Sequence, residues 1–412
     1  MTNLQLALHF FLEIAVILIA CQLVGLVGRR VGQPQVVAEM LAGILLGPSL
    51  LGLLWPGVFA RIFPPEMMKI LYPVSQVGLA TYMFVVGLEF RLDIVRAQMR
   101  SAMAVSIAGM IAPFVLGAAL GWYFHGHTSL FPATTTRLDA MLFLGASMCI
   151  TAFPVLARIV QFKGLTGTTM GAISLGAGAI NDAAAWCLLA IVLARLDGNF
   201  GGAALNIGGG IGFVALALFV IRPLAARWGR RVEAGGKLSD SEFAFCLILL
   251  MLGAWFTDAI GLHAVFGAFV LGVVFPRGLV TETLIQRIQP LMVALLVPLF
   301  FTYSGLNTQI ALLDSGYLWL MTALVLLAAI GGKGVACWLA ARATGVSHRE
   351  AMGIGTLMNV RGLMELIIIN IGLQRGIISP ALFASLAIMA VVTTVMASPL
   401  FELVAGKKRS SA

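Results

Sequence analysis

Two adjacent polar residues, Asn181 and Asp182, stand at the midpoint of an apolar run that extends from about Thr168 to Arg195. The run is long enough to cross a bilayer. An ionisable side chain at the centre of a bilayer costs roughly 2.5–3.5 kcal/mol on insertion scales, so it is a candidate functional residue. The flanking residues are mostly glycine and alanine, which leave space around the carboxylate for water, an ion or another helix.

An isolated carboxylate at this depth can hold a monovalent cation when it is ionised and a proton when it is neutral. The sequence therefore predicts a monovalent cation and proton site at Asp182 and Asn181. Asn181 could supply a neutral oxygen ligand, orient Asp182, or make a helix–helix hydrogen bond. The alternative interpretation of Asp182 is a structural acid that is paired with a buried base.

Lys333 lies among three glycines inside the apolar run over 316–343. A buried ammonium requires a partner or loses its proton readily. We expect Lys333 to pair with Asp182 in one state and to release it when a cation binds. The alternative is that its side chain extends towards the inner membrane surface.

Two other apolar runs are interrupted near their middles. Pro154 removes a backbone donor within the run over 138–162, and Thr151 offers a hydroxyl there as a cation ligand or as a helix-end partner. Seven runs later, Asn359 interrupts the run over 349–374. Interrupted segments at corresponding positions of two halves are typical of the binding site of a transporter.

Arg361 and Glu365 follow in the second interrupted run and are four residues apart. They would face each other if the segment is helical there. A local ion pair is the favoured interpretation, which would hold the interrupted segment open and balance its charge.

The composition places these residues in a membrane protein. The chain is 60% hydrophobic and only 10% charged, whereas soluble domains carry about 25% charge. The net charge of +9 does not indicate nucleic-acid binding, because the basic residues separate apolar runs instead of clustering on one soluble face. The five cysteines lie in apolar runs without metal-ligand spacing, and HExxH and GxSxG motifs are absent, so neither an enzyme nor a cofactor is expected.

Hydropathy predicts an all-α membrane protein with thirteen transmembrane helices. The predicted spans are 5–27, 35–54, 68–89, 99–124, 138–162, 168–195, 204–228, 241–259, 261–276, 285–307, 316–343, 349–374 and 380–404. Nineteen of the 26 Lys and Arg residues fall in one set of alternate loops and five in the other. This asymmetry predicts an outer N-terminus and a cytoplasmic C-terminus in the cell (inner) membrane. An odd number of spans places the two termini on opposite sides of the membrane. This arrangement favours two six-helix repeats of inverted topology around a linking helix.

The chain resembles the monovalent cation:proton antiporter superfamily, in the branch of Kef-type potassium/proton antiporters and plant cation/proton exchangers. The motifs that carry the resemblance are Asn181-Asp182, the run from Thr151 to Arg158, Lys333, the run from Met358 to Leu366, the run from Gly261 to Phe269, and Leu46-Gly47-Pro48-Ser49. The resemblance implies a sodium/proton antiporter-like fold with crossing discontinuous helices, and a homodimer. It implies one transmembrane domain over 1–404, which consists of panel helices (about 5–89 and 204–307) and core helices (about 99–195 and 316–404). A short basic cytoplasmic tail (405–412) follows this domain.

By the same resemblance, Asp182 is the cation and proton site, Lys333 its competing partner, and Pro154, Asn359, Arg361 and Glu365 support the broken helices. Strongly electrogenic relatives carry two adjacent acids, whereas this chain has Asn181 before Asp182, which favours electroneutral exchange. The expected function is alternating-access antiport of K⁺, more than Na⁺, against H⁺. The alternatives are a cation channel or ligand-gated efflux path, and an organic-anion carrier in which Lys333 and Arg361 bind the substrate. Kef-type members add a cytoplasmic nucleotide-binding domain, which is absent from this chain or was removed from it.

Overall fold

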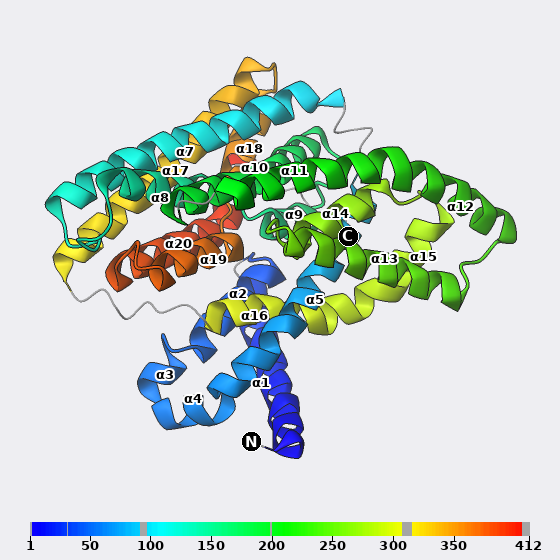
Figure 1. Ribbon diagram of the computed structural model, residues 1–412, viewed down its shortest axis with the longest axis horizontal. Helices are drawn as coiled ribbons and strands as arrows, with labels where there is room; N and C mark the ends of the chain where they lie inside the picture. The colour runs from blue at the N-terminus through cyan, green and yellow to red at the C-terminus, as the bar shows by residue number, and fades with distance from the viewer. Residues whose placement is uncertain (1, 31, 91–96, 198–199, 307–314, 406–412) are drawn as a thin grey trace. The chain divides into compact units, whose positions relative to one another are not determined.

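The computed structural model describes residues 2–30, 32–90, 97–197, 200–306 and 315–405. Every regular element in these ranges is a helix (Figure 1). The helices with their bounds are α1 (Asn3–Arg30), α2 (Gln35–Leu46), α3 (Leu51–Leu54), α4 (Pro56–Ile62), α5 (Pro65–Glu89), α7 (Met99–His127), α8 (Arg137–Cys149), α9 (Phe153–Phe162), α10 (Thr169–Asp197), α11 (Phe200–Leu216), the π-helix η1 (Ala217–Ile221), α12 (Arg222–Gly235), α13 (Asp240–Ala259), α14 (Ala264–Val274), α15 (Leu279–Leu291), the π-helix η2 (Met292–Leu296), α16 (Val297–Leu306), α17 (Gly316–Ala343), α18 (His348–Met358), α19 (Leu363–Gln374) and α20 (Pro380–Ala405).

Within the described ranges, eleven helical stretches are long and apolar enough to cross a membrane, which makes the chain an integral, multi-pass membrane protein. The predicted span over 261–276 corresponds to the shorter apolar helix α14. The predicted span over 349–374 corresponds to α18 and α19, which a break separates. The all-α membrane fold class is therefore confirmed, whereas the number of thirteen crossings stays a prediction.

Hydroxyl side chains cap several helices of the apolar chain. Thr136, Ser315 and Ser347 accept hydrogen bonds from the backbone N–H three residues later, at the starts of α8, α17 and α18. Ser239 and Glu242 form a reciprocal capping box at the start of α13. These side chains satisfy backbone donors that have no partner within the helix, and they define where each helix begins.

The described residues form two compact units. The first comprises those of Met1–Leu18, Ile62–Leu92 and Leu193–Tyr303, and the second comprises those of Ile19–Arg61, Asp93–Val192 and Ser304–Ala412. All residues of the predicted cation site belong to the second unit. The assignment of helices to a panel and a core stays a prediction. The predicted tail over 405–412 lies outside the described residues after Ala405.

In the first unit, glycines bring helix backbones into close contact. A Cβ atom at Gly87 of α5 would lie 2.4 Å from the carbonyl oxygen of Phe269 in α14, and one at Gly272 would lie 2.2 Å from that of Phe84. Small residues at helix interfaces permit this approach in membrane proteins. A methyl group at either position would therefore force α5 and α14 apart.

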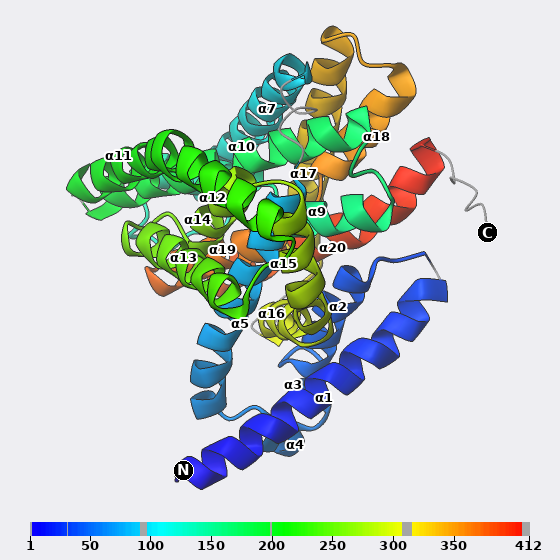
Figure 2. The same ribbon diagram turned by 90° about the vertical axis from the view of Figure 1, so that its right-hand side faces the viewer.

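In the second unit, α7 packs against both α8 and α17, and α17 also packs against α18 and α20 (Figures 1 and 2). The contact between α7 and α8 depends on Gly117 and Gly121, where an added Cβ would lie 2.8 and 2.6 Å from carbonyl oxygens of α8. The two glycines are four residues apart and lie on one helix face. This packing brings α7 close to the broken segment that follows α8.

Candidate functional site

The first helix break separates α8 from α9. Cys149 ends α8, and the backbone is extended at Ile150, with φ −72° and ψ 146°. Phe153 then begins α9, with Pro154 in its first turn. At that position the missing N–H has no partner within the helix in any case. Pro154 therefore starts the second half of the broken helix and does not kink a continuous one.

The second break separates α18, which ends at Met358, from α19, which begins at Leu363. The interruption is at the position that Asn359 predicts from the sequence. Breaks of this kind leave backbone groups without helical partners at a depth where water is scarce, and they are tolerated where protein or a cavity surrounds them.

The two breaks contact each other. The backbone N–H of Ala152 donates a hydrogen bond of 3.1 Å to the carbonyl oxygen of Val360. The Thr151 hydroxyl lies 3.5 Å from the carbonyl oxygen of Met358 and is oriented to donate to it. A Cβ atom at Gly362 would lie 3.3 Å from the Ala152 side chain. The crossing of two discontinuous helices, predicted as part of the fold, is therefore confirmed.

Asp182 lies on α10 and is only 4% exposed. Its Oδ1 atom has no hydrogen-bond partner among the described residues. Buried polar atoms are nearly always paired, and a buried carboxylate oxygen without a partner is costly. Such an atom is suited to receive a proton or a cation.

Asn181, the neighbour of Asp182, is held by a chain of hydrogen bonds. The Ser106 hydroxyl of α7 donates to Asn181 Oδ1 at 2.5 Å, and Asn181 Nδ2 donates to Thr151 Oγ1 at 3.3 Å. Thr151 in turn is directed at the end of α18. The chain of donors runs in one direction, from α7 across α10 to both breaks, and it fixes which atom of the Asn181 amide is oxygen.

Lys333 is completely buried on α17. Its Nζ atom donates to the carbonyl oxygen of Cys149, the last residue of α8, at 2.5 Å. Carbonyl groups at the C-terminus of a helix carry partial negative charge and lack helical partners, so this contact stabilises the ammonium. Lys333 therefore does not extend towards a membrane surface.

The described residues show no ion pair between Lys333 and Asp182. Lys333 and Asn181, the neighbour of Asp182 in the chain, nevertheless both lie beside Gly109 of α7. A Cβ atom there would lie 3.8 Å from Asn181 Nδ2 and 3.9 Å from Lys333 Cε. Pairing of Lys333 with Asp182 in one state stays a prediction.

Arg361 and Glu365 are both buried, and Arg361 Nη1 lies 3.4 Å from Glu365 Oε1. The Thr394 hydroxyl of α20 accepts a hydrogen bond from the backbone N–H of Arg361 and donates one to its carbonyl oxygen. Thr394 thus contacts both backbone groups that the break leaves free at Arg361, and it shares its one hydroxyl hydrogen between the carbonyl oxygens of Arg361 and Ala390. Asn359 Nδ2 donates to the carbonyl oxygen of Gly355 at 3.2 Å.

Sequence reasoning did not identify two residues that support the site, Ser106 and Thr394. Each is a hydroxyl residue in the middle of a largely apolar span. Serine and threonine in membrane helices often bond only to their own helix, so sequence does not distinguish the two cases. Their position relative to Asn181 and Arg361 was the missing information.

Comparison with known proteins gives a consistent result. The sequence model of the family described as "Sodium/hydrogen exchanger, transmembrane" matches residues 15–404. The chain is 40% identical over 394 residues to the Na⁺/H⁺ antiporter NhaS4 of Synechocystis sp. (strain ATCC 27184 / PCC 6803 / Kazusa), covering 94% of this chain and 95% of that protein.

Other relatives are longer, and the chain spans slightly less than half of their length. Cation/H⁺ antiporter 15 of Arabidopsis thaliana is 36% identical over 400 residues, which cover 96% of this chain and 48% of that protein. K⁺/H⁺ antiporter 1 of Saccharomyces cerevisiae (strain ATCC 204508 / S288c) is 31% identical, over 96% of this chain and 46% of that protein.

The fold also matches a solved structure. The sodium proton antiporter MjNhaP1 from Methanocaldococcus jannaschii superposes with a TM-score of 0.67, at 14% sequence identity, over 98% of this chain and 100% of that one. At this identity the likeness shows the fold alone. The match to the family model and the 40% identical relative together show that the chain belongs to the transmembrane sodium/hydrogen exchanger family.

Proposed function

We propose that this protein is a secondary active antiporter that exchanges a monovalent cation for protons by alternating access, with the cation and the proton competing for Asp182. The observation that carries the proposal is the buried Asp182 carboxylate, whose Oδ1 has no described hydrogen-bond partner. Its neighbour in the chain, Asn181, bonds to Thr151 at the first of the two helix breaks that contact each other. Relatives named as Na⁺/H⁺, cation/H⁺ and K⁺/H⁺ antiporters support it.

In this proposal the Asp182 carboxylate supplies the charged ligand, and Thr151 and Asn181 contribute neutral oxygens. Alkali cations are hard ions and prefer oxygen ligands. Thr151 Oγ1 accepts from Asn181 and is directed at the Met358 carbonyl. Binding of a cation would therefore involve the end of α18, as alternating access between two broken helices requires.

We further propose that Lys333 balances the charge of the site when the cation is absent. Its ammonium would leave the Cys149 carbonyl oxygen and approach Asp182 after the cation departs. Arg361 and Glu365 act indirectly by keeping the second break in shape. Arg361 is already paired with Glu365, which does not favour an organic-anion carrier that uses Arg361 to bind substrate.

The identity of the transported cation, K⁺ in preference to Na⁺, is also part of the proposal. The relatives include an antiporter named for Na⁺ and one named for K⁺, and our preference for K⁺ comes from the branch resemblance. One titrating carboxylate beside a neutral Asn181 supports a one-for-one, electroneutral exchange.

We also propose a homodimer in the inner membrane with the N-terminus outside. The orientation follows from the positive-inside asymmetry. That count includes Arg91, Arg96, Lys407, Lys408 and Arg409, which lie outside the described residues.

The test of this proposal is cation-driven proton movement in proteoliposomes. Asp182→Asn keeps the size of the side chain but removes its charge, so we expect it to abolish exchange while the protein stays folded. Asp258→Asn is the matched control because Asp258 is an exposed acid in the other unit, and this variant should exchange normally. Full activity of Asp182→Asn would exclude the site, and cation flux that ignores the pH gradient would favour a channel.

A further inference from the structure

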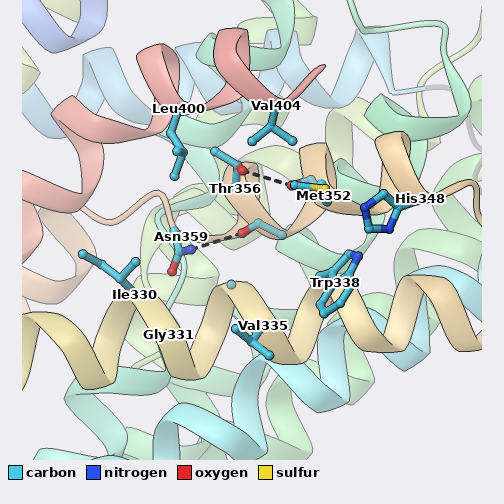
Figure 3. A pocket seen from close by; sticks show the side chains of 12 residues that line it. Ile330, Gly331, Val335, Trp338, His348, Met352, Thr356, Asn359, Leu400 and Val404 are labelled. Carbon is cyan, nitrogen blue, oxygen red and sulfur yellow. Dashed lines mark hydrogen bonds between the residues drawn. The ribbon is translucent and has the colours of Figure 1, made fainter. Parts of the chain in front are cut away.

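A pocket of about 420 Å³ lies between α17, α18 and α20 (Figure 3). Its size is within the range of sites that bind small molecules. Val335 and Trp338 of α17 line one wall, and His348 and Met352 of α18 line the facing wall. Asn359 of the second break lies at one end of the pocket and His348, the first residue of α18, at the other. An eleven-residue helix is about 16 Å long, so the pocket runs along the whole of α18.

The lining of the pocket favours an uncharged ligand. No lining residue is a carboxylate, an ammonium or a guanidinium, and most are apolar. The nearby ammonium of Lys333 is directed at the Cys149 carbonyl oxygen and is not part of the lining. The chemistry of the pocket therefore fits an uncharged molecule with an apolar body.

Two buried polar atoms in the lining lack partners among the residues described. Asn359 is only 2% exposed, and its Oδ1 atom accepts no hydrogen bond there. Its Nδ2 atom donates to the Gly355 carbonyl, which fixes the amide with Oδ1 towards the side where Ile330 and Gly331 lie (Figure 3). Trp338 Nε1 is also buried and makes no hydrogen bond in the described chain. One free acceptor and one free donor thus remain in a mostly apolar pocket, whose other polar side chains are His348 and Thr356.

The two atoms lie at different places along α17. Asn359 lies against Gly334, where an added Cβ would be 2.6 Å from Asn359 Nδ2. Trp338 follows Gly334 by four residues, which is about 6 Å along the helix. A complementary ligand therefore carries a hydrogen-bond donor and an acceptor on two separate groups.

We propose that this pocket binds a neutral single-chain lipid of the monoacylglycerol class. The hydroxyls of its headgroup supply the donor for Asn359, and its ester carbonyl accepts from Trp338. The acyl chain lies against the apolar walls. Access from the bilayer is lateral, because Val335, which lines the pocket, is 49% exposed on a membrane helix.

The bound lipid would connect the second break to α17. Asn359 precedes Val360, whose carbonyl oxygen accepts the hydrogen bond from the first break. A molecule that bridges Asn359 and Trp338 would restrain the crossing of the two broken helices. Exchange should therefore slow when the pocket is filled, a consequence that rests on the proposed antiport function, whereas binding does not.

Binding is tested on the purified full chain by photocrosslinking with a monoacylglycerol that carries a diazirine in its acyl chain, followed by mapping of the labelled peptides. We expect labels on α17 and α18. Unlabelled monoolein should compete about fivefold better than methyl oleate, which has the same chain and ester but no hydroxyl, because one net hydrogen bond is worth about fivefold in affinity. Equal competition by the two lipids would overturn the headgroup assignment.

Two tryptophan substitutions on α17 distinguish the pocket from the general lipid surface. Val335→Trp fills the pocket and should abolish the label, whereas Leu339→Trp alters a 53% exposed residue outside the lining and should keep it. Trp338→Phe, which removes only the donor, provides a milder variant and should weaken binding about fivefold. Labelling that is the same in all three variants would identify surface lipid only and overturn the site.

Transport measurements separate this proposal from the proposed function. Monoolein should slow cation/proton exchange by the unmodified protein and leave the Val335→Trp variant unaffected. If labelling follows the predicted pattern but the protein exchanges no ions, the antiport proposal fails and the lipid site stands. If exchange is normal and monoolein changes nothing, the restraint on the helix crossing is excluded.

Discussion

The amide of Asn181 is held at both of its polar atoms, because Ser106 donates to Oδ1 and Nδ2 donates to Thr151. This arrangement fixes the orientation of the amide next to Asp182 in the chain. A freely rotating amide could present its N–H groups to the site and repel a cation. The direction of Asn181 Oδ1 is thus determined by a serine on another helix.

Ser106→Ala tests this arrangement. We expect the cation concentration for half-maximal exchange to rise about tenfold, since a buried hydrogen bond contributes on the order of 1–1.5 kcal/mol. Ser106→Thr retains the hydroxyl and should restore most of the affinity. The measurement is exchange against cation concentration in proteoliposomes.

Ser75→Ala is the control for this substitution. Ser75 is also fully buried, but it lies in the other unit and donates to the Tyr72 carbonyl of its own helix. An equal loss of cation affinity in both alanine variants would show that Ser106 acts through general stability and not through Asn181.

Lys333 is the second residue whose role can be measured. Lys333→Gln removes the positive charge that we propose competes with the cation for Asp182. The apparent cation affinity should then depend less on pH, because one group that responds to protons is lost from the site. Exchange across a pH series measures this dependence. The exposed Lys237→Gln is the control, and a pH profile of Lys333→Gln identical to that of the unmodified protein would assign Lys333 a structural role.

At the scale of elements, the second break is held by the buried pair of Arg361 and Glu365 and by Thr394. Removing one member of a buried pair leaves an uncompensated charge and costs about 3–5 kcal/mol, whereas replacing both with apolar residues is often neutral. Arg361→Met should therefore lower the unfolding temperature more than the double variant Arg361→Met/Glu365→Leu does. Thermal unfolding in detergent micelles is the measurement, and additive effects would contradict the pairing.

Contact between α17 and α18 can be tested with two glycines. A Cβ at Gly355 would lie 2.6 Å from the backbone carbonyl oxygen of Gly334, whereas a Cβ at Gly331 meets nothing within 4 Å. Gly355→Ala should lower the unfolding temperature. Gly331→Ala should keep or raise it, because alanine in a helix is favoured over glycine by about 0.5–1 kcal/mol. The same response to both changes would mean that the helices are not in backbone contact at Gly355.

Sequence patterns predicted the broken elements well because the residues that interrupt a membrane helix are conspicuous. Pro154 and Asn359 stand in apolar runs, and the helices end within a few residues of them. The partners across the breaks could not be predicted in the same way. The hydrogen bond from Ala152 to Val360 joins two backbone groups, and no side-chain type in the sequence specifies it.

At the scale of the whole molecule, hydropathy predicted the fold class from spans that the structure largely reproduces as helices. It was least informative where a span is short, as for α14, or divided, as for α18 and α19. Hydropathy reflects the free energy of transferring a continuous helix from water into lipid. A divided helix depends in addition on neighbouring helices, which surround its free backbone groups. Contacts such as Lys333 with the Cys149 carbonyl oxygen depend on packing between spans that are distant in sequence.

The ratio of cations to protons exchanged determines how much net charge crosses the membrane in one transport cycle. In the proposed mechanism Asp182 is the one titrating carboxylate of the site and Asn181 beside it is neutral, so we expect one monovalent cation to replace one proton and no net charge to cross the membrane. A cation jump on a solid-supported membrane should then give no sustained current, while a pH dye in the same proteoliposomes reports proton movement. Asn181→Asp adds a second carboxylate that can carry a second proton against one cation, so its exchange should generate a current. A sustained current from the unmodified protein, with proton movement to match, would mean that a second group, Lys333 first among them, carries a proton through the cycle.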